Sequence, residues 1–186
     1  MAPGPILTVP NQLTFLRLVF IPFFLIVLYL DRYAWALVLL SAAALTDMLD
    51  GLLARQLDQR SALGAYLDPI ADKLMLSSSF FLLALKGKIV WWLAILVLAR
   101  DVLILVSAAV IVAVIGYRPL PPSVYGKAAT LAQILLVVVA IAAPVLEWQI
   151  LETLDLPMAI VTAALTIFSG VHYSIVIARR LHVPAA

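Results

Sequence analysis

The 186-residue sequence contains no cysteine and only two histidines. Without cysteine the chain can form neither a disulfide nor a thiolate metal site, and it has no cysteine nucleophile. Charged residues are also scarce: they make up 12% of the chain, whereas a soluble domain usually carries about 25%. The net charge of +2 is too small to indicate nucleic acid as a partner.

Hydrophobic residues, by contrast, make up 66% of the sequence. A chain of this length cannot bury so much apolar surface away from water, so we expect lipid to be its solvent. Six apolar segments approach or exceed the about 20 residues that a membrane-spanning helix needs. They cover residues 12–30, 34–57, 62–85, 90–115, 124–146 and 157–180. The sequence therefore predicts an all-α integral membrane bundle of six transmembrane helices, forming one domain over residues 1–186.

The distribution of basic residues predicts how this bundle is oriented. Short breaks separate the six segments, so neighbouring helices should be antiparallel, and residues 6–11 are expected to form a short interfacial helix. One side then holds Arg17, Arg55, Arg60, Arg118, Lys127, Arg179 and Arg180, and the other holds Arg32, Lys86, Lys88 and the acidic stretch 147–155. Because cytoplasmic loops carry the excess of Lys and Arg, both termini and the 55–60 turn should face the cytoplasm, in the cell (inner) membrane.

Four aspartates stand inside the second and third segments, where charge is costly. Each costs about 2.5–3.5 kcal/mol near the middle of a spanning helix. Folding the two helices as a hairpin about residues 59–60 brings Asp47 level with Asp72 and Asp50 level with Asp68. We therefore expect four carboxylates to meet within about one helical turn of depth.

Converging carboxylates without histidine or cysteine form a hard-ligand site, which suits Mg²⁺, Mn²⁺ or Ca²⁺. Two divalent ions would balance the four negative charges, and paired ions can clamp the oxygens of a phosphoryl displacement. The alternative is a structural polar network. Gly51 and Gly64 leave room for a ligand or for close helix approach, and Arg55 has the fork of donors that binds phosphate, unless it is only an anchor at the interface.

The spacing of these residues resembles the signature of a known family, the CDP-alcohol phosphatidyltransferases. The segment from Asp47 to Asp72 reads D-x2-D-G-x2-A-R-x8-G-x3-D-x3-D, with Ala54 before Arg55. The resemblance implies six transmembrane helices, a homodimer, and transfer of a phosphatidyl group from CDP-diacylglycerol to an alcohol, which attacks the β-phosphorus and releases CMP.

The resemblance also implies separate roles for the motif residues. The metal ligands would be Asp47, Asp50 and Asp68, together with Asp72, and Asp72 would be the general base that takes the proton from the acceptor hydroxyl. The cofactor would be Mg²⁺ or Mn²⁺, with two ions bound. The part that holds the cytidine diphosphate would comprise Asp50, Gly51, Ala54, Arg55 and Gly64.

Weaker outer motifs bear on the acceptor alcohol. Residues 11–17, the run 66–74 around Asp68, and the pairs Gly126-Lys127 and Ser169-Gly170 resemble bacterial phosphatidylglycerophosphate synthases. Arg100-Asp101 instead resembles the mitochondrial-type cardiolipin synthases of the same family. Glycerol 3-phosphate is therefore the expected acceptor, and phosphatidylglycerol is the alternative.

A phosphorylated acceptor needs cations, and Arg100, Lys127 and Arg17 are the candidates. Each has a plainer alternative: Arg100 would pair internally with Asp101, and the other two would mark helix ends at the interface. A divalent-cation transporter using the same carboxylates is a competing function. A transporter would favour inverted repeats and broken helices, and the sequence shows neither.

Overall fold

The computed structural model describes the backbone of residues 9–57, 62–115 and 123–181. Within these ranges it describes the side chains of residues 16, 18–46, 71, 73–107, 123–148, 150–151 and 153–177. The described chain is helical apart from short turns and contains no strand, which confirms the all-α prediction for those ranges.

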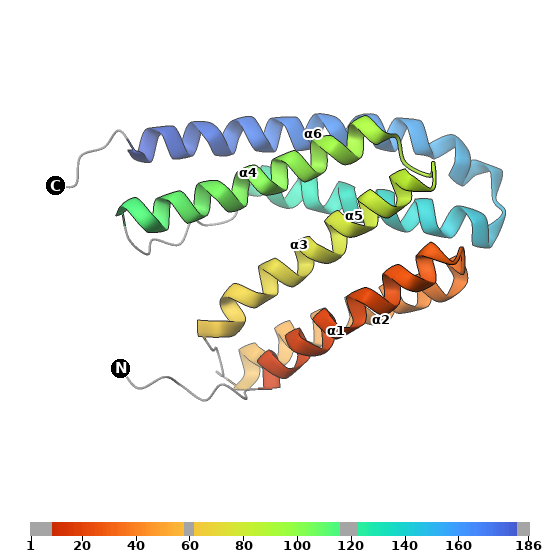
Figure 1. The fold of residues 1–186 in the computed structure, drawn as a ribbon, viewed down its shortest axis with the longest axis horizontal. Coiled ribbons are helices and arrows are strands. Elements are labelled where there is room, and N and C mark those ends of the chain that lie inside the picture. Colours follow the sequence, from red (N-terminus) through yellow and green to blue (C-terminus); the bar gives the residue numbers. More distant parts are fainter. Residues whose placement is uncertain (1–8, 58–61, 116–122, 182–186) are drawn as a thin grey trace. The chain divides into compact units, whose positions relative to one another are not determined.

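Six helices follow one another along the chain (Figure 1). They are α1 Val9–Tyr29, α2 Tyr33–Leu57, α3 Ala62–Leu85, α4 Trp91–Ile115, α5 Val124–Leu146 and α6 Gln149–Leu181. The six predicted segments correspond to these helices one by one. Residues 9–11, expected in a separate interfacial helix, are the first residues of α1, and residues 6–8 lie outside the described part.

The start of α6 is the main departure from the predicted helix limits. The segment was expected to begin at Pro157, whereas α6 begins at Gln149 and contains Pro157 in its interior. Proline fixes φ near the helical value and removes a single N–H donor, so it weakens a helix without always ending it. With 33 residues, α6 is about 50 Å long at about 1.5 Å per residue.

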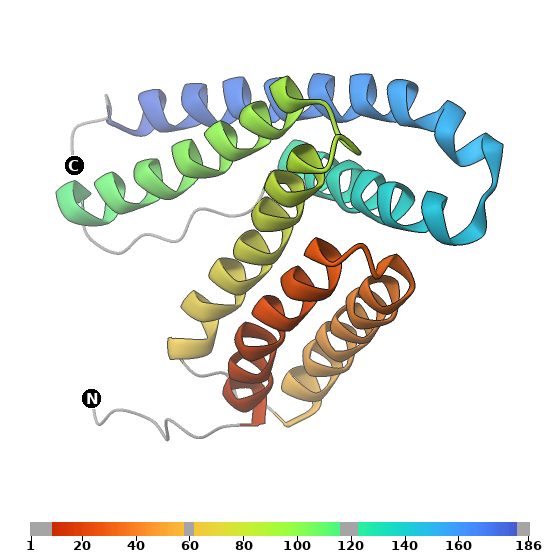
Figure 2. The ribbon, with the colours of Figure 1, turned by 45° about the vertical axis from the view of Figure 1, so that its right-hand side comes forward.

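The chain divides into two compact units. The first comprises residues 1–82 and 141–147, and in it α1 packs along α2, as Figures 1 and 2 show. Its interior is mainly apolar: Phe24 and Leu28 of α1, Ala36 of α2 and Phe80 of α3 are almost fully buried, with Ser79 as the buried polar residue of the described part of this unit.

The second unit comprises residues 83–140 and 148–186. Within it α4 packs along α6 (Figure 2). Leu93, Val97, Leu136 and Ala163 are buried here, but so are six polar residues, namely Arg100, Asp101, Gln133, Thr162, Thr166 and Ser169. This unit therefore contains a polar interior that needs an explanation.

Three of the helices end in tight turns with a residue in the left-handed region. Asp31 follows α1 with φ 57°, Gly87 follows α3 with φ 67°, and Glu147 follows α5 with φ 51°. After α3, Lys88 donates its N–H to the carbonyl of Leu83 at 2.9 Å, which is the bond of a Schellman cap. Only one of the three positions carries glycine, the residue that adopts this conformation without strain.

Two helical segments of the described part are long and apolar enough to cross a membrane: Val124–Leu146 and Thr153–Ile177. Three shorter apolar stretches, Leu18–Tyr29, Tyr33–Thr46 and Lys73–Leu85, lie in α1, α2 and α3. Many large apolar side chains are exposed, including Phe23, Ile95, Ile160 and Phe168. The structure thus indicates membrane association, while the six-span arrangement remains a prediction.

Candidate functional site

The motif residues lie on two helices that follow one another in the chain. Five of them, Asp47, Asp50, Gly51, Ala54 and Arg55, belong to the C-terminal half of α2, and Gly64, Asp68 and Asp72 belong to the N-terminal half of α3. The backbone confirms that Asp47 and Asp50 are one turn apart on one helix and that Asp68 and Asp72 are one turn apart on the next.

The side chains of these motif residues lie outside the described part. Whether Asp47 meets Asp72, and Asp50 meets Asp68, therefore stays a prediction. Among the side chains that the structure describes, no group of three or more histidines and carboxylates could hold a metal ion. The fit to a divalent metal rests on the chemistry of the donor set: four carboxylates are the ligands that hard cations prefer.

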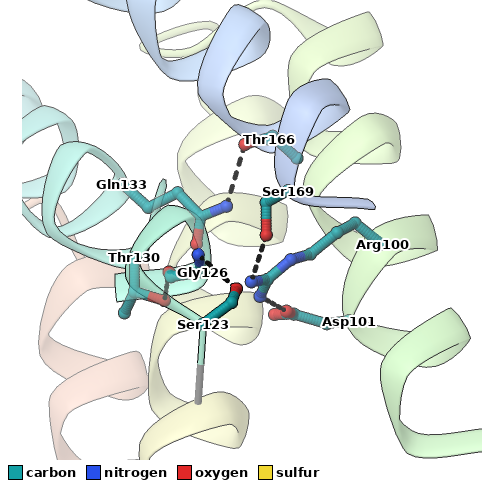
Figure 3. A network of polar contacts seen from close by, with 8 residues as sticks. All are labelled: Arg100, Asp101, Ser123, Gly126, Thr130, Gln133, Thr166 and Ser169. Atoms are coloured by element: carbon teal, nitrogen blue, oxygen red, sulfur yellow. Dashed lines mark hydrogen bonds and ion pairs between the residues drawn. The ribbon is translucent and has the colours of Figure 1, made fainter. Parts of the chain in front are cut away.

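Arg100 lies in the middle of α4, and its side chain is buried, with 8% of the residue exposed. Its Nη1 donates to Oδ1 of Asp101 at 2.7 Å, and its Nη2 donates to the hydroxyl of Ser169 on α6 at 3.1 Å. Figure 3 shows the guanidinium between these two partners. A buried cation is tolerated when it is paired and hydrogen-bonded. The internal ion pair with Asp101, the alternative to an acceptor-binding role, is therefore present.

Two glycines allow the neighbouring helices to come close to this arginine. A β-carbon at position 126, in the first turn of α5, would lie 3.5 Å from Nη2 of Arg100 and 3.7 Å from Oγ of Ser169. A β-carbon at Gly170 on α6 would lie 3.8 Å from Cγ of Arg100. The side chain of Arg100 therefore passes close to backbone of both α5 and α6, inside the second unit.

The first turn of α5 is capped by Ser123. Its hydroxyl accepts a hydrogen bond from the N–H of Gly126 at 3.0 Å, which is the pattern of a helix N-cap. Thr130 donates its hydroxyl to the carbonyl of Gly126 at 3.0 Å. The backbone at Gly126 is thus bonded on both sides and lies against the guanidinium of Arg100 (Figure 3).

Further along, polar side chains join α5 to α6. Nε2 of Gln133 donates to the hydroxyl of Thr166 at 3.0 Å, and the hydroxyl of Thr162 donates to the carbonyl of Ala132 at 3.4 Å. Gln133 and Thr166 are fully buried. Thr162, Thr166 and Ser169 are spaced four and three residues apart, so they form one polar stripe along α6.

The other two predicted acceptor cations differ from Arg100. Lys127 follows Gly126 directly, and its side chain is exposed, with no hydrogen bond or ion pair to any residue whose side chain the structure describes. Arg17 lies on α1, and its side chain is outside the described part. Of these two residues, Lys127 is the one that the structure places near Arg100, because the neighbouring Gly126 lies beside the guanidinium.

Sequence reasoning missed the partners of Arg100 other than Asp101. The sequence presents Ser169 only as part of a weak motif, because residues 69 positions apart give no local signal of contact. A usable signal existed: hydroxyl residues at positions 162, 166 and 169 recur at helical spacing inside an apolar segment, and polar side chains within a membrane helix usually face other helices.

Comparison with known proteins decides the family. The sequence model of the CDP-alcohol phosphatidyltransferases matches residues 7–172, which run through both units. The chain belongs to the CDP-alcohol phosphatidyltransferase family. It is therefore an enzyme of phospholipid biosynthesis that transfers a substituted phosphate group from a CDP-activated donor to an alcohol.

Relatives of this CDP-alcohol phosphatidyltransferase carry names that differ in the acceptor. A Mycobacterium tuberculosis protein called "Probable phosphatidylglycerophosphate synthase" is 34% identical over 174 residues, 88% of this chain and 78% of the relative. "Cardiolipin synthase (CMP-forming)" of Streptomyces coelicolor is 37% identical over 131 residues, 67% of this chain and 60% of the relative. A Yersinia enterocolitica "CDP-diacylglycerol--glycerol-3-phosphate 3-phosphatidyltransferase" is 40% identical over 105 residues, which are 53% of this chain and 57% of the relative.

Proposed function

We propose that this enzyme transfers the phosphatidyl group of CDP-diacylglycerol to glycerol 3-phosphate, giving phosphatidylglycerophosphate and CMP. The observation that carries the proposal is the complete aspartate signature from Asp47 to Asp72, on consecutive helices within the matched span. The names of the Mycobacterium and Yersinia relatives support this acceptor. The Streptomyces relative supports phosphatidylglycerol, and thus cardiolipin synthesis, as the second candidate.

The motif residues would divide the chemistry between them. Asp47, Asp50, Asp68 and Asp72 would hold two divalent ions, Mg²⁺ or Mn²⁺, which would supply charge neutralisation for the diphosphate. Arg55 would bind a phosphate of the donor, beside Gly51, Ala54 and Gly64. Asp72 would take the proton from the acceptor hydroxyl, so that this oxygen can attack the β-phosphorus and CMP leaves.

The acceptor's phosphate would be held by basic side chains. Lys127 is the best supported of the three candidates, because its ammonium is exposed and has no partner in the described part of the chain. Arg17 remains a second candidate. Arg100 is already paired with Asp101 and Ser169, so its contribution is a separate question.

The assembly of the enzyme is part of the same proposal. We expect six crossings of the bacterial inner membrane, a homodimer, and an active site that opens to the cytoplasmic side. The apolar stretches in α1, α2, α3, α5 and α6 support this arrangement. All four tryptophans, Trp35, Trp91, Trp92 and Trp148, are exposed near helix ends on the predicted outer side, where an aromatic belt is expected.

An acceptor panel tests the proposed function. The protein, purified in detergent, would be given CDP-diacylglycerol, Mg²⁺ and one of glycerol 3-phosphate, phosphatidylglycerol, inositol phosphate or serine. We expect CMP release and a phosphatidylglycerophosphate product with glycerol 3-phosphate alone. Cardiolipin as the product would select the second candidate. If no acceptor yields CMP while reconstituted liposomes show divalent-cation flux, the enzyme proposal is wrong.

A further inference from the structure

We propose that Arg100 is a positioning residue and not a phosphate ligand: held by Asp101 and Ser169, it fixes the first turn of α5 and so places Lys127 for the acceptor's phosphate. The inference rests on the proposed function, because it assigns how one cation of that site is positioned. It is carried by contacts that all lie within the second unit.

The surroundings of Arg100 leave it poorly suited to meet a phosphate. Its charge is already balanced by Asp101 at 2.7 Å, in an ion pair whose two side chains are only 7% and 6% exposed. A second guanidinium nitrogen, Nη2, donates its hydrogen bond to the hydroxyl of Ser169. The remaining Nε atom has no partner in the described part, but it is buried. An incoming dianion would therefore meet a neutralised, shielded pair rather than an open cation.

The same contacts suit Arg100 to hold α5. Its guanidinium reaches from α4 to Ser169 on α6, and its Nη2 would lie 3.5 Å from a β-carbon at position 126. Gly126 is itself bonded to the capping hydroxyl of Ser123, so the capping hydroxyl and the guanidinium both lie beside the first turn of α5. Lys127 is the next residue, so the position of this turn determines where its exposed side chain begins.

The absence of side chains at Gly126 and Gly170 belongs to the same arrangement. A β-carbon at 126 would lie 3.2 Å from Oγ of Ser123, closer than such contacts normally are, and would also be in van der Waals contact with Nη2 of Arg100 at 3.5 Å. Gly126→Ala should therefore disturb the cap and shift the α5 turn away from the guanidinium. It provides a second way to disturb Lys127 without changing any charge.

Ser169→Ala is the first test, because it removes one hydrogen bond and keeps the ion pair. We expect the KM for glycerol 3-phosphate to rise about five- to tenfold, the size of the net contribution of one typical hydrogen bond, with kcat and the KM for CDP-diacylglycerol within about twofold of wild type. Gly126→Ala should act in the same direction. The matched control is Ser174→Ala, also on α6, whose hydroxyl only bonds back to the carbonyl of Gly170.

A double-mutant cycle with Lys127→Ala separates positioning from direct contact. If Arg100 acts through Lys127, Ser169→Ala and Arg100→Gln will raise the acceptor KM in the wild-type background but not in the Lys127→Ala background. If Arg100 itself binds the phosphate, the effects of Arg100→Gln and Lys127→Ala will multiply, and the inference is overturned. Thermal midpoints of all variants would show that each one is folded.

The two proposals fail in different ways. A wild-type enzyme that releases no CMP with glycerol 3-phosphate or phosphatidylglycerol contradicts the proposed function. A wild-type enzyme that turns over glycerol 3-phosphate, with an acceptor KM unchanged by both Ser169→Ala and Gly126→Ala, contradicts only the positioning role.

Discussion

At the residue scale, the second unit shows how charge and hydroxyl groups are kept inside an apolar bundle. Arg100 is paired with the neighbouring Asp101 and bonded to Ser169, while Gln133 finds Thr166 on α6. Each of these side chains exchanges water for at least one protein partner, because an unpaired buried polar group costs about 1–3 kcal/mol, although Nε of Arg100 and Oε1 of Gln133 have no partner in the described part of the chain. The polar residues of this unit are therefore organised as contacts between α4, α5 and α6.

Asp72 is the residue whose replacement should be most damaging to the chemistry. Asp72→Asn removes the base and one carboxylate of the motif, so we expect kcat to fall by about 10²–10⁴-fold. The measurement is CMP release with glycerol 3-phosphate and saturating CDP-diacylglycerol. Glu147→Gln, at an exposed position after α5, makes the same carboxylate-to-amide change and should leave kcat unaltered. Comparable kcat values for the two variants would rule out a catalytic role for Asp72.

The hydrogen bond between Gln133 and Thr166 joins α5 to α6. Its contribution to the free energy of unfolding depends on whether one partner or both are replaced. Gln133→Ala leaves a cavity and removes the partner of Thr166, so we expect the free energy of unfolding to fall by about 1–3 kcal/mol. The double variant Gln133→Leu/Thr166→Val replaces both partners with apolar groups and should be close to wild type. Thermal midpoints in the same detergent measure both. A double variant less stable than Gln133→Ala would contradict this account.

At the element scale, the left-handed cap residues predict opposite effects at two turns. Gly87 has φ 67° and open space around it, so Gly87→Ala should destabilise the protein by about 1–2 kcal/mol through backbone strain alone. Glu147 adopts φ 51° with a side chain, so Glu147→Gly should stabilise it by up to about 1 kcal/mol. Thermal unfolding of both variants checks the signs, and equal shifts in one direction would refute the strain argument.

The limits of five helices could be predicted because apolar runs and turn signals are local. The breaks at Asp31-Arg32 and at Lys86 to Lys88 coincide with the ends of α1 and α3. The early start of α6 could not be predicted, since the polar stretch before Pro157 resembles a loop by composition. Neither the charged residues nor the single proline, however, prevents a helix from forming there. The motif aspartates were placed on the correct helices, but their mutual contacts depend on how α2 and α3 pack.

The contacts of Arg100 were only half predictable. Its pairing with the adjacent Asp101 is a local arrangement that the sequence suggested. Its bond to Ser169 and its closeness to Gly126 depend on how α4, α5 and α6 pack, and no periodicity within one helix contains that information. The predicted role of Arg100 as an acceptor ligand therefore gave way to a proposed positioning role.

At the scale of the whole molecule, the predicted topology can be read with single cysteines, because the natural chain has none. Cysteine introduced at Lys86 or Glu147 should react with an impermeant maleimide added to intact cells. Cysteine at Val124, which is 78% exposed at the start of α5, should react only after the membrane is permeabilised. The reverse labelling pattern would mean that the orientation is inverted.

The tight caps after α1, α3 and α5 also determine what a protease can do to this enzyme. The intervening connections are only residues 30–32, 86–90 and 147–148, and their backbone is already hydrogen-bonded to the preceding helices. A protease needs an extended, flexible segment to bind, and none of these turns offers one. If the predicted orientation holds, a protease added to intact cells should therefore leave these three turns uncut, and cleavage at any of them would report local unfolding of a helix end.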